Sequence, residues 1–313
     1  MKVVIIEPLG ISDEKLMLSA KESLGDKAEL VYYNIRSTDE DELIRRGKDA
    51  DIIVVSNLPL SERVLSRCEV LKFISVAFTG VDHIPMDYCR TRGITVSNCA
   101  GYSTRAVSEL VFGMLISMYR NIIPCNEAVR REGTKNGLVG NELFGKKFGI
   151  IGTGAIGLRT AAIARAFGCD ILAWSRTRKE VEGIQYVELD ELLSRCDIVS
   201  LHVPLTAETR GLIDEKKLSL MKKNAVLVNT ARGPVVDSIA LAKALKAEDI
   251  AGACIDVFET EPPIPADHPL LTSPHVIATP HVAFATEEAL EAREKMVFAN
   301  VAAFLDGRPI NVM

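Results

Sequence analysis

The sequence predicts a two-domain α/β protein whose domains are both built on parallel sheets. The chain has 313 residues, which is enough for two domains with substantial cores. Short apolar runs alternate with helical stretches along its length, a pattern typical of parallel α/β sheets. A glycine-rich turn, Gly152-Thr-Gly-Ala-Ile-Gly157, lies in mid-chain between an apolar run and a helical stretch. A second α/β series therefore begins after a complete first one.

The composition narrows the class of protein. Apolar residues make up 48% of the chain and charged residues 25%, as in ordinary globular proteins. A net charge of -5 without a basic block gives no reason to expect a nucleic-acid partner. The seven cysteines are scattered without a CxxC pair, which argues against a disulfide framework or a zinc site and favours a reducing compartment. With no signal peptide and no apolar run of membrane-spanning length, we expect a soluble, cytoplasmic protein with no metal and no membrane partner.

The first third of the chain reads as strands alternating with helices. We expect strands at residues 3–6, 30–33, 52–55 and 71–76, and helical segments that end at residue 23 or span residues 39–47 and 61–68. No glycine-rich turn follows any of these strands. This third is therefore predicted to be an α/β domain without a nucleotide motif of its own.

The next segment has a different character. From Asn98 to Arg120 apolar residues recur at helical spacing and charges are sparse after Glu109, so we expect a long buried helix. Residues 120–144 form a less regular arm with three glycines. Such an arm either embraces a second subunit or is a plain surface loop.

The glycine-rich turn opens the second series. We expect strands at residues 147–151, 170–174, 196–201, 225–229, 250–256 and 275–278, and helices at residues 155–167, 214–221, 238–246 and 286–305, with another beginning near residue 189. Within the turn, Gly152 permits the tight bend, Gly154 lets the backbone approach a pyrophosphate, and Gly157 lets the helix pack on the strand. The helix N-terminus then offers N–H groups and a partial positive charge to phosphates. This strand–turn–helix context favours a dinucleotide site in a Rossmann-type, doubly wound sheet over a purely structural glycine turn.

Polar residues that could carry chemistry follow three later strands. Arg232 lies in Asn-Thr-Ala-Arg-Gly-Pro, and its planar guanidinium suits a carboxylate. Asp256, Glu259 and Glu261 follow the next strand, and His281 follows the last one. Each could singly be a surface residue. Ligands of open α/β sheets bind at the carboxyl ends of strands, however, and an acid paired with His281 would stabilise its protonated form.

Over essentially its full length the sequence resembles the D-isomer-specific 2-hydroxyacid dehydrogenase family. The segments that match are Gly80-Val-Asp-His-Ile84, Asn98 with residues 101–109, residues 152–157, His202-Val-Pro-Leu-Thr206, Asn229-Thr-Ala-Arg-Gly233, residues 256–263 and Thr279-Pro-His281. Together they are far more specific than the glycine motif alone.

The resemblance implies a role for each candidate residue. Arg232 would bind the substrate carboxylate and polarise the carbonyl, His281 would give the proton to the developing alkoxide, and Glu261 would stabilise the imidazolium. Asp256 would lie near the nicotinamide carboxamide. Backbone N–H groups of a loop would hold the substrate carboxylate, and this loop consists of Ala77, Phe78, Thr79 and Gly80. The residues expected at the cofactor are Thr104, Gly152, Thr153, Gly154, Ala155, Ile156, Gly157, Ser175, Arg176, Thr177, Val203, Pro204, Thr230, Ala231, Arg232, Asp256 and His281.

The chain departs from the family pattern in two places. Phe78 stands where the family often has glycine, which predicts a bulkier substrate loop. An NAD enzyme usually has an aspartate after its second strand to bind the ribose hydroxyls, whereas this chain reads Trp174-Ser-Arg-Thr-Arg178 with no acid until Glu180. This turn lacks repulsion toward a 2′-phosphate and resembles the NADPH-using glyoxylate/hydroxypyruvate reductases. NADP is therefore expected, and NAD with a solvated basic turn is the alternative.

We therefore expect a Rossmann-type dinucleotide domain, residues 99–285, between the two parts of a flavodoxin-like α/β substrate domain, residues 1–98 and 286–313, with cofactor and substrate meeting between them. The expected activity is reduction of glyoxylate, hydroxypyruvate or a similar small 2-keto acid to the D-2-hydroxy acid, by a homodimer. An NAD-dependent D-lactate-like or D-3-phosphoglycerate dehydrogenase is the first alternative. A corepressor-like protein that senses the dinucleotide is an alternative of another class.

Overall fold

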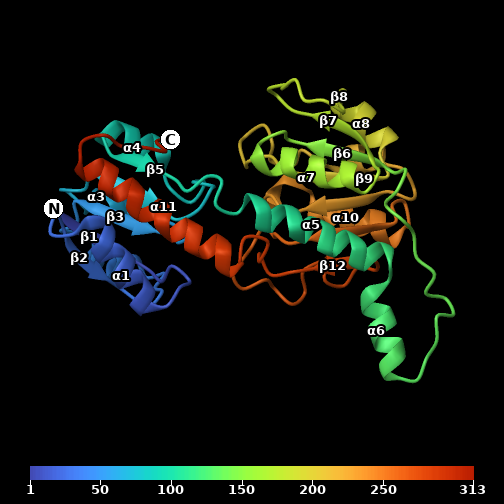
Figure 1. Ribbon diagram of the computed structural model, residues 1–313, viewed down its shortest axis with the longest axis horizontal. Coiled ribbons are helices and arrows are strands. Elements are labelled where there is room, and N and C mark those ends of the chain that lie inside the picture. The colour runs from blue at the N-terminus through green and yellow to red at the C-terminus, as the bar shows by residue number, and fades with distance from the viewer. The chain divides into compact units, whose positions relative to one another are not determined.

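The computed structural model describes residues 1–313, and the chain divides into two compact units (Figure 1). Unit 1 comprises Met1–Ser103 and Ala285–Met313, and unit 2 comprises Thr104–Phe284. The sequence-based division placed residues 99–103 and Ala285 in the second domain, whereas here they belong to unit 1. The assignment of substrate binding to one unit and nucleotide binding to the other remains a prediction.

Unit 1 contains a five-stranded parallel sheet in the order β2-β1-β3-β4-β5, which is the flavodoxin-like order. Its strands are β1 (Lys2–Ile5), β2 (Glu29–Tyr32), β3 (Ile52–Val55), β4 (Phe73–Val76) and β5 (Thr95–Ser97). Its helices are α1 (Asp13–Leu24), α2 (Glu40–Gly47), α3 (Glu62–Ser66), α4 (Met86–Arg92) and α11 (Glu287–Leu305). The sequence did not predict α4 and β5, because the residues Met-Asp-Tyr-Cys-Arg-Thr-Arg and Thr-Val-Ser show no clear apolar run or helical period.

The end of the chain belongs to the core of unit 1. Thr286 caps α11 by accepting a hydrogen bond from the backbone N–H of Ala289 at 3.1 Å. The helix then packs on α1 and β4, where the ring of Phe304 stacks on that of Phe73 with centroids 4.4 Å apart. Unit 1 is therefore completed by residues that follow unit 2 in the sequence.

Unit 2 contains a seven-stranded parallel sheet in the order β12-β11-β10-β9-β6-β7-β8, the doubly wound Rossmann order extended by one strand. Its strands are β6 (Lys147–Ile151), β7 (Asp170–Trp174), β8 (Ile184–Tyr186), β9 (Ile198–Leu201), β10 (Val226–Asn229), β11 (Gly252–Ile255) and β12 (Val276–Ala278). Its helices are α5 (Thr104–Tyr119), α6 (Ile122–Arg130), α7 (Ala155–Ala166), α8 (Leu189–Arg195), α9 (Glu215–Leu218) and α10 (Ser238–Lys246), with a 3-10 turn at Gly233–Val235. The predicted fold class, with its two kinds of α/β domain, is confirmed.

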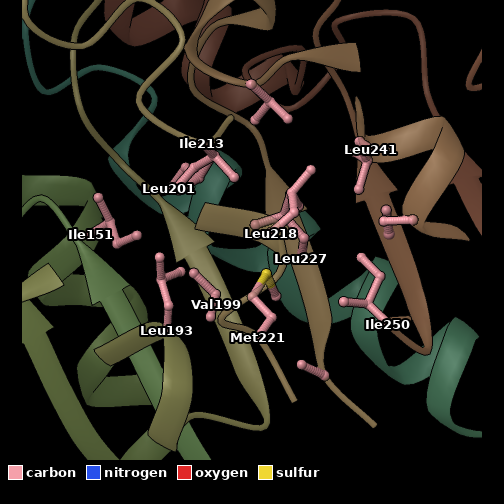
Figure 2. Packing of buried hydrophobic residues seen from close by; sticks show 14 of the residues in the cluster. Ile151, Leu193, Val199, Leu201, Ile213, Leu218, Met221, Leu227, Leu241 and Ile250 are labelled. Atoms are coloured by element: carbon pink, nitrogen blue, oxygen red, sulfur yellow. The ribbon is translucent and has the colours of Figure 1, made fainter. Parts of the chain in front are cut away.

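The sheet of unit 2 has an apolar layer on each face, which explains why its central strands β9, β10 and β11 are wholly buried. On one face, side chains from the strands such as Val199 and Leu227 meet Leu193 from α8 and Leu241 from α10 (Figure 2). On the other face, α5 and α7 pack together and cover Phe148 of β6. The rigid sheet between these layers fixes the positions of the strand ends.

The sequence predicted a less regular arm at residues 120–144, but part of this arm is helical. It begins with the helix α6, which has no buried residue and extends from the end of α5 beyond the sheet of unit 2 (Figure 1). The helix pattern was missed because the segment is short and its apolar residues are exposed. No single helix of the chain is both long and apolar enough to cross a membrane, and only the bent pair of α5 and α6 meets that test by combined length and composition.

Candidate active site

The glycine-rich turn between β6 and α7 contains two glycines that the fold requires and a third that the fold itself does not require. Gly152 has a φ of 99°, and a Cβ there would lie 2.5 Å from the carbonyl oxygen of His202. A Cβ on Gly157 would lie 2.0 Å from the carbonyl oxygen of Gly152. At Gly154, the N-cap of α7, a Cβ would meet nothing within 4 Å. The open space at the start of a helix fits the approach of a phosphate group.

The side chain of Thr153 ties this turn to the basic turn after β7. The Thr153 hydroxyl accepts a hydrogen bond from the Tyr186 hydroxyl at 3.1 Å. The Tyr186 hydroxyl in turn accepts one from the backbone N–H of Lys179 at 3.2 Å. The basic turn contains Arg178, which pairs with Glu188 at 2.8 Å, and Arg176, which is exposed and forms no ion pair. Tyr186 lies on β8, and its role could not be predicted because the residues Ile-Gln-Tyr of this strand show no clear pattern.

Arg232 is presented by a turn that Asn229 builds at the end of β10. The buried Asn229 side chain donates to the carbonyl oxygen of Arg232 at 3.0 Å and accepts from the N–H of Ala231 at 3.1 Å. The Arg232 guanidinium donates to the Ala231 carbonyl oxygen at 2.7 Å. In the same turn, the Thr230 hydroxyl is buried without a hydrogen-bond partner, which fits a group that completes its bonding with a ligand.

Asp256 organises the turn that carries His281. Its buried carboxylate accepts hydrogen bonds from the Thr279 hydroxyl at 2.5 Å and from the N–H groups of Val282 and Ala283, both at 2.9 Å. Burial raises the pKa of Asp256, and these hydrogen bonds oppose that effect. The N–H of His281 donates to the Asp256 carbonyl oxygen at 2.7 Å. Asp256 was expected beside the nicotinamide, and the contacts here show it shaping the histidine turn.

His281 and Glu261 form a hydrogen-bonded pair. The imidazole Nδ1 lies 2.6 Å from Glu261 Oε1, and the other carboxylate oxygen accepts from the N–H of Phe258 at 3.0 Å. His281 has a φ of 55°, which is uncommon for a residue other than glycine, so the turn stores local strain to aim the ring. The carboxylate therefore orients the imidazole through Nδ1.

A second histidine at the same edge of the sheet has a different environment. His202 follows β9, and its Nε2 lies 2.9 Å from the hydroxyl of the buried Ser200. Burial lowers the pKa of His202 to about 3, so the ring is neutral near pH 7. Of the two, only His281 has a carboxylate that could stabilise an imidazolium.

The remaining residues expected at the cofactor also lie at this edge or near it. Ser175 and Thr177 follow β7, Val203 and Pro204 follow β9, Ala155 and Ile156 begin α7, and Thr104 begins α5. The carboxyl ends of parallel strands lie on one edge of a sheet, so the strand register places all of these residues except Thr104 at that edge. No group of three or more histidine, cysteine or acidic side chains is arranged to hold a metal ion.

The loop Ala77–Gly80 follows β4 in unit 1. Phe78 is only 6% exposed, and its ring packs against Tyr102 and under the guanidinium of Arg293. The expected bulk of this loop is therefore directed into unit 1. The loop backbone is fixed by the Asn98 side chain, which donates to the Thr79 carbonyl oxygen at 2.7 Å, while the Thr79 hydroxyl is buried without a partner.

Comparison with known proteins places the chain in a family. Residues 112–283 match the D-isomer specific 2-hydroxyacid dehydrogenase family, NAD binding domain. The chain is 40% identical to a glyoxylate reductase of Thermofilum pendens, over 85% of this chain and 82% of that protein. It is also 40% identical to a D-3-phosphoglycerate dehydrogenase of Methanocaldococcus jannaschii, over 86% of this chain but only 52% of that longer protein.

The chain belongs to the D-isomer specific 2-hydroxyacid dehydrogenase family. Among solved structures, an acyclic imino acid reductase (Bsp5) in complex with NADPH and D-Arg matches the whole of both chains with a TM-score of 0.91 and 32% identity. The predictions of this family, of an NAD(P)-dependent dehydrogenase and of a nicotinamide dinucleotide as cofactor are thereby confirmed. The gap at Gly154 and the buried Thr230 hydroxyl fit such a cofactor.

Proposed function

We propose that this family member reduces a small 2-keto acid, with glyoxylate or hydroxypyruvate as the first candidates, to the D-2-hydroxy acid with NADPH. The observation that carries the proposal is the His281–Glu261 pair, with 2.6 Å between Nδ1 and Oε1, on the same sheet edge as the dinucleotide turn. The relative named glyoxylate reductase supports the substrate class.

The proposed roles follow from the charges that develop during reduction. A bound nicotinamide cofactor would supply the hydride for the carbonyl carbon, and the carbonyl π electrons would then move onto oxygen. Arg232 binds the substrate carboxylate and stabilises the charge on that oxygen. His281 transfers its Nε2 proton to the oxygen and becomes neutral, while its Nδ1–H stays hydrogen-bonded to Glu261. In the oxidative direction the same atoms move in reverse.

The substrate carboxylate is assigned to the loop Ala77–Gly80 of unit 1. The hydrogen bond from Asn98 holds this loop, and the buried Thr79 hydroxyl has unused bonding capacity. Because Phe78 packs into unit 1, its bulk is not expected to select the substrate side chain directly. The N–H of Ala77 donates to the Val55 carbonyl oxygen at 2.7 Å, so the assignment rests on the backbone N–H groups of residues 78–80.

The preference for NADPH is assigned to the turn after β7. No acid follows the strand until Glu180, so nothing in the turn repels a 2′-phosphate. Arg176 is exposed and forms no ion pair, and Ser175 and Thr177 add hydroxyl donors. NAD is the alternative, together with a lactate-like or phosphoglycerate-like substrate.

The active protein is proposed to be a homodimer of the cytoplasm. The exposed helix α6 offers an apolar surface to a second copy. All seven cysteines are free, and six of them are buried, as in proteins of reducing compartments.

An assay matrix tests the proposal. Glyoxylate, hydroxypyruvate, pyruvate and 3-phosphohydroxypyruvate are each combined with NADPH or NADH, and cofactor oxidation is followed by absorbance. We expect the highest kcat/KM for glyoxylate or hydroxypyruvate with NADPH. In the same assay His281→Ala should lose at least about 100-fold in kcat while binding NADPH normally. Absence of turnover with every keto acid would instead support the cofactor-sensing, corepressor-like alternative.

A further inference from the structure

A second carboxylate–imidazole pair lies in the loop between β11 and β12. His268 Nε2 is 3.0 Å from Glu259 Oε2. The His268 residue is 8% exposed, and its ring meets that of Phe258 edge to face with centroids 5.0 Å apart. The Glu259 side chain is 37% exposed. The proposed reaction uses neither residue.

The hydrogen bonds around His268 determine which nitrogen carries the proton. The N–H of Leu270 donates to Nδ1 at 3.3 Å, so Nδ1 is an acceptor and Nε2 carries the hydrogen that Glu259 accepts. In this arrangement both ring nitrogens are hydrogen-bonded, and the ring links residue 259 to residue 270 of the loop.

Glu259 also holds the start of α10. Its carboxylate accepts a hydrogen bond from Ser238, the first residue of that helix. Burial tends to raise the pKa of Glu259, but the hydrogen bonds from Ser238 and His268 outweigh this effect and lower it. Glu259 therefore stays ionised and joins two segments that flank the candidate active site.

The backbone beside Glu259 contacts both arms of the site. The N–H of Phe258 donates to Glu261 Oε2 at 3.0 Å and so fixes the carboxylate that faces His281. A Cβ on Gly233, next to Arg232, would lie 2.1 Å from the Phe258 carbonyl carbon and 2.5 Å from the Glu259 nitrogen. The Arg232 turn therefore rests directly on residues 258 and 259. A displacement of this backbone would move the Glu261 carboxylate and the Arg232 turn together.

We propose that Glu259 and His268 are positioning residues that hold Glu261 against His281 and keep the Arg232 turn in place. This inference rests on the proposed function, because it assigns the pair to the proton-transfer step. Charged groups that face His281 include Glu261 and Asp256, and Glu259 faces Ser238 and His268. Loosening Glu261 removes part of the support for the imidazolium. Reduction needs protonated His281, so the loss of kcat at high pH would then begin at a lower pH.

The test compares kcat–pH profiles for glyoxylate reduction with NADPH. Glu261→Gln is the reference and should move the high-pH midpoint downward most. Glu259→Ala and His268→Ala should move it in the same direction, by at least about half a pH unit. Glu259→Gln keeps one acceptor oxygen, which suffices for the hydrogen bond from His268, and should restore part of the wild-type profile. Asp267→Ala, at an exposed position of the same loop without a hydrogen bond, is the matched control and should change nothing.

The outcomes separate this inference from the proposed function. A shift in Glu261→Gln without one in Glu259→Ala or His268→Ala overturns the positioning role alone. A uniform loss of kcat at every pH in the two alanine variants, with an unmoved midpoint, also overturns it. Absence of a shift in Glu261→Gln refutes the acid–base assignment itself. If the alanine variants do not fold, Glu259→Asp keeps the charge but shortens its reach, and an unmoved midpoint in that variant overturns the inference.

Discussion

Arg176 and Arg178 lie two residues apart in the turn after β7, yet they differ in what holds them. Arg178 pairs with Glu188, whereas Arg176 forms no ion pair. Arg176→Ala is therefore expected to weaken NADPH binding about tenfold and leave NADH unchanged, since one charge-assisted contact to a 2′-phosphate is lost. Arg178→Ala should have a smaller effect and serves as the matched control. Fluorescence titration gives the Kd of each variant relative to wild type, for NADPH and for NADH. An unchanged Kd for NADPH in Arg176→Ala would show that the turn is merely solvated surface.

His202 makes the stability of unit 2 depend on pH. Its pKa is lowered by burial from 6.5 to about 3, so the unfolded chain binds the proton more tightly than the folded one. This stabilising contribution is complete above pH 6.5 and is lost as the pH falls toward 3. Between pH 7.5 and pH 5, wild type should lose about 2 kcal/mol of unfolding free energy through this residue.

His202→Gln should not show this pH-dependent loss of unfolding free energy. Trp174, the single tryptophan, lies at the end of β7 in unit 2, so its fluorescence during denaturant unfolding reports on the correct unit. Equal pH dependence in wild type and variant would show that the ring titrates normally in the folded protein.

The sequence predicted which side chains to compare but not how each is held. Arg232, Glu261 and His281 could be selected because they follow successive strands of one sheet. The positive φ of His281 and the use of the Asp256 carboxylate to shape its turn could not be predicted. Both depend on contacts between residues 20 or more positions apart, which no local pattern reports. The inward packing of Phe78 was hidden for the same reason.

In the turn from β6 to α7, we expect different glycines to be needed for folding and for cofactor binding. Alanine at Gly154 would meet no neighbour, and its φ of −70° suits any residue. Gly154→Ala should therefore change the unfolding free energy by only about 0.5 kcal/mol, while weakening NADPH at least about tenfold because the Cβ blocks the approach of phosphate.

Gly157→Ala is the structural counterpart of that variant. Its Cβ would lie 2.0 Å from the Gly152 carbonyl oxygen, so α7 must shift from β6, at a cost of about 1–3 kcal/mol. Thermal unfolding and cofactor titration of both variants measure the two effects separately. Normal cofactor affinity in Gly154→Ala would show that the pyrophosphate does not bind at this turn.

Apolar runs and helical periods were predictable, even for the three-residue strand β12, whereas β5 and β8 were not predicted. β3, β7 and α10 lie where the sequence placed them. β5 and β8 are defined by pairing with β4 and β7 and not by their own pattern. Tyr186 of β8 therefore remained hidden, although it links Thr153 to the basic turn.

At the scale of the whole molecule, the mid-chain position of the glycine motif predicted that the chain leaves one α/β unit, builds another and returns. The arm of unit 2 presents a different problem. Its base is fixed, because the N–H of Asn141 donates to the Tyr119 carbonyl oxygen at 2.7 Å and a Cβ on Gly140 would lie 2.2 Å from the same oxygen. Its apolar side chains remain uncovered, with Val129 73% exposed and Val139 85% exposed. A fixed projection with apolar residues is suited to a second copy of the chain.

Val129→Glu combined with Val139→Glu should therefore convert a dimer into a monomer, because each interface would bury unpaired carboxylates. Light scattering after size exclusion should give twice the chain mass of 34.2 kDa for wild type and the single mass for the variant. Ile239→Glu, at an exposed apolar position on α10 outside the arm, is the matched control and should stay dimeric. A monomeric wild type, or a variant that stays dimeric, would show that the arm is a surface projection with no role in assembly. If the monomer keeps its kcat, the proton-transfer residues of one chain suffice for catalysis.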